Sequence, residues 1–194
     1  MLHPTETVVS LSGDPYDPAA VDRARTLKGY ASRRPFLCLV PDIDAARGLA
    51  RAWPPEADLL ASGFWPGPLT LLLAASDRAP AAVAEAGTIA LRPAVDPVSA
   101  ALLAAWGRAL FSTSANRRGE LAPHDVAAAL AELGPAPGGE AIEVALLPGR
   151  PDEPSGLPST IVDATSRPVR VVREGAVSSA AIRAVVGTLD EGSR

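Results

Sequence analysis

The chain of 194 residues is poor in the residues that build disulfide frameworks, metal sites and aromatic cores. A single cysteine, Cys38, excludes a disulfide scaffold and a cysteine-rich metal site. Aromatic residues make up only 4% of the chain, so we expect a core of Ala, Leu and Val. Because Cys38 lies within an apolar run, it is expected to be a buried, unreactive thiol.

The sequence also has no long apolar run and no excess of positive charge. No basic segment followed by an apolar stretch opens it, and no apolar run reaches the roughly 18 residues of a membrane span. Lys and Arg total 18 against 22 Asp and Glu, a net charge of −4. Bulk electrostatics therefore do not favour binding to nucleic acid or an anionic membrane. We expect a soluble, cytoplasmic protein without a membrane partner.

Several common catalytic motifs do not occur. The sequence has no Walker A motif, no G-x-G-x-x-G and no G-x-S-x-G elbow. The two histidines, His3 and His124, lie at the start of the chain and at an expected helix start. A Ser-His-Asp triad and a histidine-rich metal site are therefore not expected.

Proline is abundant, at 20 of 194 residues, about twice the usual share of roughly 5%. Asp17-Pro18 and Asp96-Pro97 each resemble an N-cap followed by proline at the first helical position. Short apolar runs between them are typical of buried strands. The expected strands are residues 7–11, 36–40, 69–75, 88–92, 110–114, 142–146, 159–163 and 169–173. The expected helices are residues 18–28, 43–53, 97–105, 124–133 and 179–186.

The alternation of strand and helix predicts an α/β fold, with helices packed on a mainly buried sheet. We expect a single domain over residues 1–194. Residues 147–158 are rich in proline and glycine, and they are expected to form a stiff loop rather than a linker between domains.

Polar residues stand at the expected strand ends and in tight turns, where α/β sheets bind ligands. Cations and hydroxyl groups in such places suit a polyanion such as a nucleoside triphosphate. The same residues also fit solvated helix ends and ordinary strand or turn positions. Spacing alone leaves both interpretations open. The candidates are Thr5, Lys28, Arg33, Thr70, Arg92, Ser114, Asn116, Ser159 and Arg173.

The order in which several motifs follow one another along the chain decides between these interpretations. They are Pro4-Thr5-Glu6-Thr7-Val8, the Lys28 region, the turn at residues 64–70, Ser114-Ala115-Asn116 with Gly119, and residues 159–163. Together they resemble the YrdC/Sua5 family of threonylcarbamoyl-AMP synthases over about residues 4–176. The resemblance implies a single-domain twisted open sheet with helices packed on it and a deep, positively charged cavity.

The resemblance also implies a reaction. L-threonine and bicarbonate give a carbamate, which attacks the α-phosphate of ATP, releases pyrophosphate and leaves threonylcarbamoyl-AMP. The enzyme would thus be a nucleotidyltransferase. Mg²⁺ is expected to travel with ATP, without a protein-ligated metal. A tRNA threonylcarbamoyl-transferase complex would then move the group onto adenosine in tRNA, the t6A modification.

By the same resemblance, site roles are expected for particular residues. The expected catalytic residues are Lys28, Ser114 and Asn116. The expected ATP-binding residues are Lys28, Arg33, Thr70, Ser114, Asn116, Ser159 and Arg173. The expected threonine-binding residues are Thr5 and Arg92. Because Lys28 ends a helix, we also expect that its replacement by alanine leaves the fold intact.

The sequence departs from the family pattern at some positions. Tyr30 stands where the family has arginine after Lys28, although Arg33 or Arg34 could replace it, and Asp96 stands where histidine is frequent. Loss of one charge-assisted hydrogen bond costs about 1.5–3 kcal/mol. An alternative is therefore a diverged family member that binds nucleotide or RNA without synthesis. A carbamoyl-transfer module like those of hydrogenase maturation factors is a weaker alternative, because those modules belong to much longer chains.

Overall fold

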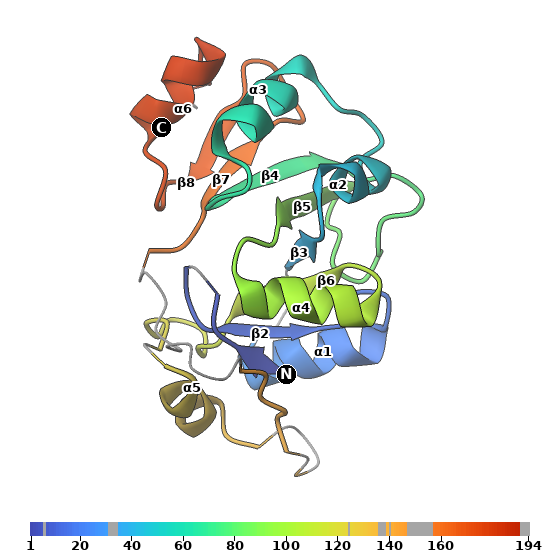
Figure 1. Cartoon of the computed structure of the whole chain (residues 1–194), viewed down its shortest axis with the longest axis vertical. Coiled ribbons are helices and arrows are strands. Elements are labelled where there is room, and N and C mark those ends of the chain that lie inside the picture. The colour runs from blue at the N-terminus through green and yellow to red at the C-terminus, as the bar shows by residue number, and fades with distance from the viewer. Residues whose placement is uncertain are drawn as a thin grey trace.

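The computed structural model describes residues 1–5, 7–30, 35–123, 125–135, 139, 141–146 and 157–190. It contains an eight-stranded sheet in the order β1-β2-β6-β3-β5-β4-β7-β8 (Figure 1). The strands are β1 (Leu2–His3), β2 (Ser10–Gly13), β3 (Leu37–Val40), β4 (Leu69–Ala74), β5 (Thr88–Pro93), β6 (Leu110–Ser114), β7 (Thr160–Asp163) and β8 (Arg170–Arg173). The pairs β3–β5 and β4–β7 are parallel and the other pairs are antiparallel.

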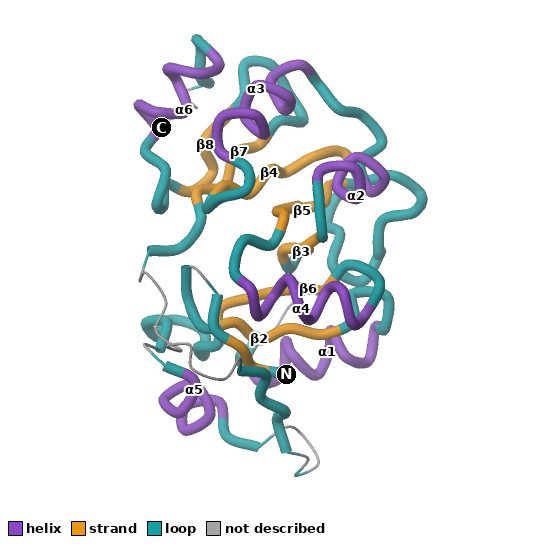
Figure 2. Tube along the Cα trace, viewed as in Figure 1, coloured by secondary structure: helices purple, strands orange, loops and turns teal. Residues whose placement is uncertain are grey.

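Helices are interspersed with these strands along the chain (Figure 2). They are α1 (Pro18–Leu27), α2 (Ile43–Leu49), α3 (Pro55–Phe64), α4 (Pro97–Trp106), α5 (Val126–Leu133) and α6 (Ser179–Val186). Figure 1 shows α3 and α6 beside β4, β7 and β8 at one end, and α1, α4 and α5 around β2 and β6 at the other. The expected α/β fold with helices on a sheet is confirmed.

Side-chain caps explain where most helices begin. Both Asp-Pro pairs behave as the sequence predicts, since Asp17 accepts the Ala19 N–H and Asp96 accepts the Ser99 N–H. In the other capped helices, the side chains of Asp42, Asp125 and Ser178 each accept a backbone N–H of the first turn.

The core is aliphatic, as the shortage of aromatic residues predicts. Leu69, Leu71 and Leu73 on β4 are fully buried, as are Ile89 and Leu91 on β5. Cys38 is also fully buried. Burial raises the pKa of its thiol to about 12, which confirms an unreactive side chain at neutral pH.

Two expected elements have clearly different bounds in the structure, and one helix was not foreseen. The strand expected at residues 7–11 begins only at Ser10. The helix expected over residues 43–53 ends at Leu49, because Ala50 leaves it to form a bridge with Ala75. α3 was not foreseen, although Pro55 at its start and two acidic residues in its first turn are favourable helix signals.

The prediction of a strand at residues 142–146 is wrong. The segment meets the sheet edge only at β1, where Val144 forms a single bridge with Leu2. Because β1 has two residues and Pro4 follows it without an N–H to donate, the ladder cannot extend. Most of the loop expected at residues 147–158 lies outside the described residues. Among the described helices, none has the length and apolar character needed to cross a membrane.

One buried hydroxyl group holds the segment between β8 and α6 in place. Thr160 Oγ1 donates to the Val177 carbonyl at 2.5 Å and accepts the N–H groups of Gly175 and Val177 at 2.9 and 3.0 Å. Thr160 is fully buried, so water cannot replace these bonds. This hydroxyl therefore holds the approach to α6 against β7.

We predict that Thr160→Val lowers the free energy of unfolding by about 1–3 kcal/mol, the cost of leaving a buried polar group unsatisfied. Urea denaturation measures the change. The control, Thr188→Val at an exposed position, should stay within about 0.5 kcal/mol of the unchanged protein. A loss of the same size in both variants would contradict this role for the Thr160 hydroxyl.

Candidate functional site

Lys28 is the single lysine of the chain, and its side chain points inward. It forms the C-cap of α1, yet only 1% of it is exposed. The ammonium Nζ donates to the Ser114 carbonyl at 2.5 Å and to the Asn116 carbonyl at 2.8 Å, and it lies 3.5 Å from Asn116 Oδ1. The expectation that Lys28 lies outside the core is therefore wrong. A buried ammonium needs oxygen partners, and the loop after β6 supplies them.

Burial changes the electrostatics of Lys28. Desolvation lowers the pKa of its ammonium from 10.5 to about 8, and the nearby Glu132 carboxylate opposes this shift in part. The Tyr30 ring centroid lies 5.6 Å from Nζ, within cation–π range. Tyr30, which stands where the resemblance implies an arginine, thus lies beside the only lysine.

The loop after β6 is held at several points. The Arg118 N–H donates to the Lys28 carbonyl at 2.9 Å, and the Ala115 N–H donates to the Val9 carbonyl at 2.9 Å. Asn116 Nδ2 donates to the Glu120 carbonyl at 2.7 Å. Lys28, Ser114 and Asn116, the three expected catalytic residues, therefore form one connected group, which we call the lysine cluster.

A second group forms where β4, β5, β7 and β8 run side by side. Leu71 stands opposite Leu91, so Thr70 stands opposite Arg92. Across β7, Thr70 pairs with Ile161, and Ile161 pairs with Arg173. Because register partners share one face of a sheet, Arg92, Thr70 and Arg173 lie in one row.

We call Thr70, Arg92, Ser159 and Arg173 the arginine cluster; Arg92 belongs to it by register, and hydrogen bonds join the other three. Thr70 Oγ1 lies 2.9 Å from Ser159 Oγ, so one hydroxyl donates to the other. Arg173 Nη2 donates to the Ser159 carbonyl at 2.8 Å. Thr70, Ser159 and Arg92 are at most 5% exposed. The cluster therefore combines the buried guanidinium of Arg92 and two buried hydroxyl groups with the guanidinium of Arg173, which is exposed.

The two arginines of the arginine cluster influence each other. Burial and the positive charge of Arg92 both lower the pKa of Arg173. An anionic group placed between two such guanidiniums would relieve this repulsion and accept charge-assisted hydrogen bonds. The arrangement is suited to a phosphate or a carboxylate.

Thr5 has a different local role from the one expected of a ligand contact. Its hydroxyl donates to the Val8 carbonyl at 2.7 Å and accepts the N–H groups of Thr7 and Val8 at 3.2 Å. The hydroxyl is thus used to shape the turn between β1 and β2. The carbonyl of Val9, the last residue before β2, accepts the Ala115 N–H, so this turn lies against the lysine cluster. Contact of Thr5 with threonine stays a prediction.

Other expectations about the site have separate outcomes. Arg33 and Arg34 lie outside the described residues. Among the residues that the structure describes, no three His, Cys, Asp or Glu side chains form a group that could hold a metal ion. Sequence reasoning missed a buried group of polar side chains, His3, Ser12, Asp96 and Ser99, because a strand as short as β1 gives no periodic signal.

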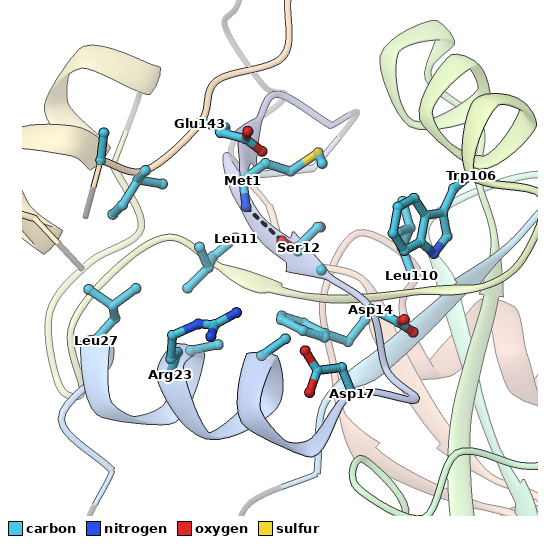
Figure 3. Close-up of a pocket in the computed structure, with 16 residues that line it drawn as sticks. Met1, Leu11, Ser12, Asp14, Asp17, Arg23, Leu27, Trp106, Leu110 and Glu143 are labelled. Carbon is cyan, nitrogen blue, oxygen red and sulfur yellow. Dashed lines mark hydrogen bonds between the residues drawn. The ribbon is translucent and has the colours of Figure 1, made fainter. Parts of the chain in front are cut away.

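The cavity of Figure 3, about 560 Å³ in volume, does not include the expected site residues. It lies between α1, β2, β6 and the segment at residues 141–143, and acidic side chains line it together with Arg23. Figure 3 shows Asp14, Asp17 and Glu143 around it, with Trp106 at its border. The positively charged cavity that the resemblance implies is a different feature, and it stays a prediction.

Comparison with known proteins shows which family the chain resembles. The profile of the family named for Sua5, YciO and YrdC, described as "Telomere recombination", matches residues 1–175. The threonylcarbamoyl-AMP synthase of Alkalilimnicola ehrlichii is 37% identical over 168 residues, which is 86% of this chain and 85% of the relative. The threonylcarbamoyl-AMP synthase of Pyrococcus abyssi is 30% identical over 190 residues, 96% of this chain and 53% of the relative.

A solved structure supports membership of the same family. The crystal structure of Pyrococcus abyssi Sua5 complexed with L-threonine matches with a TM-score of 0.86 and 28% identity. The match covers 97% of this chain and 54% of the archaeal chain, so this chain spans about half the length of that protein. The expected twisted α/β fold is confirmed by this likeness. With a profile that matches most of its length and two relatives at 30% identity or more, the chain belongs to the Sua5/YciO/YrdC family.

Proposed function

We propose that the protein is an L-threonylcarbamoyladenylate synthase, which makes threonylcarbamoyl-AMP and pyrophosphate from L-threonine, bicarbonate and ATP. The observation that carries this proposal is the lysine cluster, in which Lys28 holds the carbonyls of Ser114 and Asn116. Relatives named for this synthase share 30–37% of their aligned residues with the chain. The Pyrococcus abyssi structure contains L-threonine, which supports threonine as the amino-acid substrate here.

The chemistry needs charge neutralisation and alignment more than a protein nucleophile. In the proposed reaction the carbamate oxygen attacks the α-phosphorus, and the bond to pyrophosphate breaks in line. Arg92 and Arg173 would compensate negative charge on phosphate or carboxylate groups. The hydroxyl groups of Thr70 and Ser159 would orient them by hydrogen bonding. Mg²⁺ would enter with ATP and would neutralise the charge on its phosphates.

Lys28 has two roles in this proposal. It fixes the end of β6 at Ser114 and the following loop at Asn116, because its ammonium is bound by both backbone carbonyls. Its positive charge also lies directly beneath that loop, where it lowers the energy of negative charge on a nearby phosphate. In the cytoplasm, the product would pass to the transferase complex that modifies tRNA.

One observation favours a second candidate, a nucleotide or RNA binder without synthase activity. Tyr30 stands beside Lys28 in the place of the family arginine. The loss of that charge would weaken phosphate binding by roughly tenfold to over a hundredfold. Retention of both clusters supports the synthase over this candidate.

Pyrophosphate release tests the proposal. Purified protein is incubated with ATP, Mg²⁺, bicarbonate and L-threonine, and each of the last two is omitted in turn. The synthase requires both for release. ATP binding by calorimetry without release would support the second candidate instead.

Lys28→Ala should abolish turnover, with a loss of at least a hundredfold in kcat/KM, and should also lower thermal stability. The variant leaves the Ser114 and Asn116 carbonyls without the ammonium that binds them. Pyrophosphate release and a thermal melt measure the two effects. Arg23→Ala, which changes an exposed residue of α1, is the control and should keep its activity. Turnover of the Lys28 variant within threefold of the unchanged protein would contradict the assigned role.

The pH dependence of Lys28 is directly measurable, because it is the only lysine. A chain labelled with ¹³C-lysine should give one ε-carbon signal that titrates at about pH 8 rather than near 10.5. Between these values the unfolded chain binds a proton that the folded chain has lost, so the free energy of unfolding rises with pH. Activity should fall over the same range as the ammonium becomes neutral. A midpoint above 10 would contradict this account.

Tyr30→Arg should restore a cation beside the lysine cluster. We predict a KM for ATP roughly tenfold lower, because one charge-assisted hydrogen bond contributes about 1.5–3 kcal/mol. Tyr30→Phe is the matched control, which keeps the ring and adds no charge. An unchanged KM in the arginine variant would show that Tyr30 does not limit ATP binding.

A further inference from the structure

A buried polar cluster lies beside the site, and the proposed reaction does not use it. It consists of His3 on β1, Ser12 on β2, and Asp96 and Ser99 at the start of α4. Each of the four is at most 3% exposed. Polar groups are costly to bury unless they are hydrogen-bonded, so their arrangement calls for a reason.

The hydrogen bonds of His3 determine its protonation. Nδ1 lies 3.0 Å from the Pro4 carbonyl, and a carbonyl can only accept, so Nδ1 carries a proton. Nε2 lies 2.8 Å from Ser12 Oγ. Burial lowers the pKa of His3, so the ring is neutral and Nε2 accepts the Ser12 hydroxyl proton. Each ring nitrogen therefore has a partner.

His3 also faces the start of α4. Ser99 Oγ lies 3.4 Å from His3 Nδ1, and the Ser99 N–H donates to Asp96 Oδ1 at 2.9 Å. The negative charge of Asp96 acts on the imidazole, where it opposes the effect of burial on the His3 pKa. Asp96 Oδ2 is buried and has no hydrogen-bond partner among the described residues. β1 and the start of α4 thus contact each other through polar side chains, and such contacts require particular distances and directions.

The two segments that meet here carry the two expected threonine-binding residues. Thr5 follows His3 by two positions, and Arg92 precedes Asp96 by four. Thr5 bonds to its own turn, so its place depends on what β1 contacts at one end of the turn, as well as on the Val9–Ala115 bond at the other. A shift of His3 relative to α4 would change the distance between Thr5 and Arg92.

We propose that His3 is a positioning residue for the amino-acid subsite of this protein. In this proposal, which rests on the proposed synthase function, its neutral imidazole holds the Thr5 turn against the segment that follows Arg92. His3 itself is buried and touches neither substrate. Because a displacement of about 1 Å can cost roughly a hundredfold, its effect should appear in threonine binding and leave ATP binding nearly unchanged.

The test compares His3→Phe with Ser99→Ala. The phenylalanine keeps an aromatic ring of similar size in the core but makes no hydrogen bond to Pro4 or Ser12. Ser99→Ala removes the contact on the α4 side and keeps a good helix former. Threonine and ATP are each varied in the pyrophosphate assay, and a thermal melt reports folding. We expect the KM for threonine to rise about ten- to a hundredfold in His3→Phe and less in Ser99→Ala, with the KM for ATP within twofold.

Two further variants separate positioning from a general loss of stability. His3→Asn keeps a donor near the place of Nδ1 and should recover part of the threonine affinity. Val21→Ala removes two buried methyl groups in α1, a helix that carries none of the four cluster residues, and should lower the melting temperature without changing the KM for threonine. If His3→Phe does not fold, Ser99→Ala and His3→Asn carry the comparison.

An unchanged KM for threonine in folded His3→Phe, or equal rises in KM for both substrates, would overturn the proposal. If His3→Phe is unfolded, a KM for threonine in Ser99→Ala equal to that of the unchanged protein would overturn it too. If the unchanged protein shows no threonine-dependent release, the proposed function fails and this inference fails with it. Because that outcome is seen in the unchanged protein, it is distinguishable from a failure confined to the variants.

Discussion

A buried ammonium group organises one side of this molecule. Lys28 at the end of α1 is almost fully enclosed, and water does not solvate its charge. The carbonyls of Ser114 and Asn116 replace that water, so removal of either the charge or the loop leaves the other without its partner. This mutual requirement fixes the loop after β6 relative to α1. The turn between β1 and β2 follows, because Val9 bonds to Ala115 in that loop.

The sheet supplies the second half of the arrangement. Its register places Arg92 on β5, Thr70 on β4 and Arg173 on β8 in one row, although they are far apart in the sequence. The buried guanidinium of Arg92 and the exposed guanidinium of Arg173 repel each other until an anion joins them, and the positive charge of Arg92 contributes to the lowered pKa of Arg173. The fold thus keeps a site whose electrostatics favour a negatively charged ligand.

Local signals in the sequence were enough to predict much of this fold. Asp17 and Asp96 cap helices where the Asp-Pro pairs indicated, and β6 has the expected bounds. The direction of the Lys28 side chain could not be predicted, because it depends on carbonyls that lie 86 and 88 positions further along the chain. The segment at residues 142–146 has strand character, yet it pairs with the sheet at only one position. The limit is the shortness of β1, the strand beside it, and the sequence of the segment itself does not reveal which strand it will meet. The use of the Thr5 hydroxyl within its own turn is likewise visible only in three dimensions.

The most direct test of the central claim is detection of the product itself. The protein is incubated with ATP, Mg²⁺, L-threonine and ¹³C-bicarbonate, and the small molecules are analysed by mass spectrometry. If the two clusters form a synthase site, one ¹³C atom appears in a compound whose mass is that of AMP joined to threonine through a carbonyl group. AMP or ADP without such an adduct, in a protein that binds ATP, would contradict the claim and would leave a nucleotide-binding member of the family.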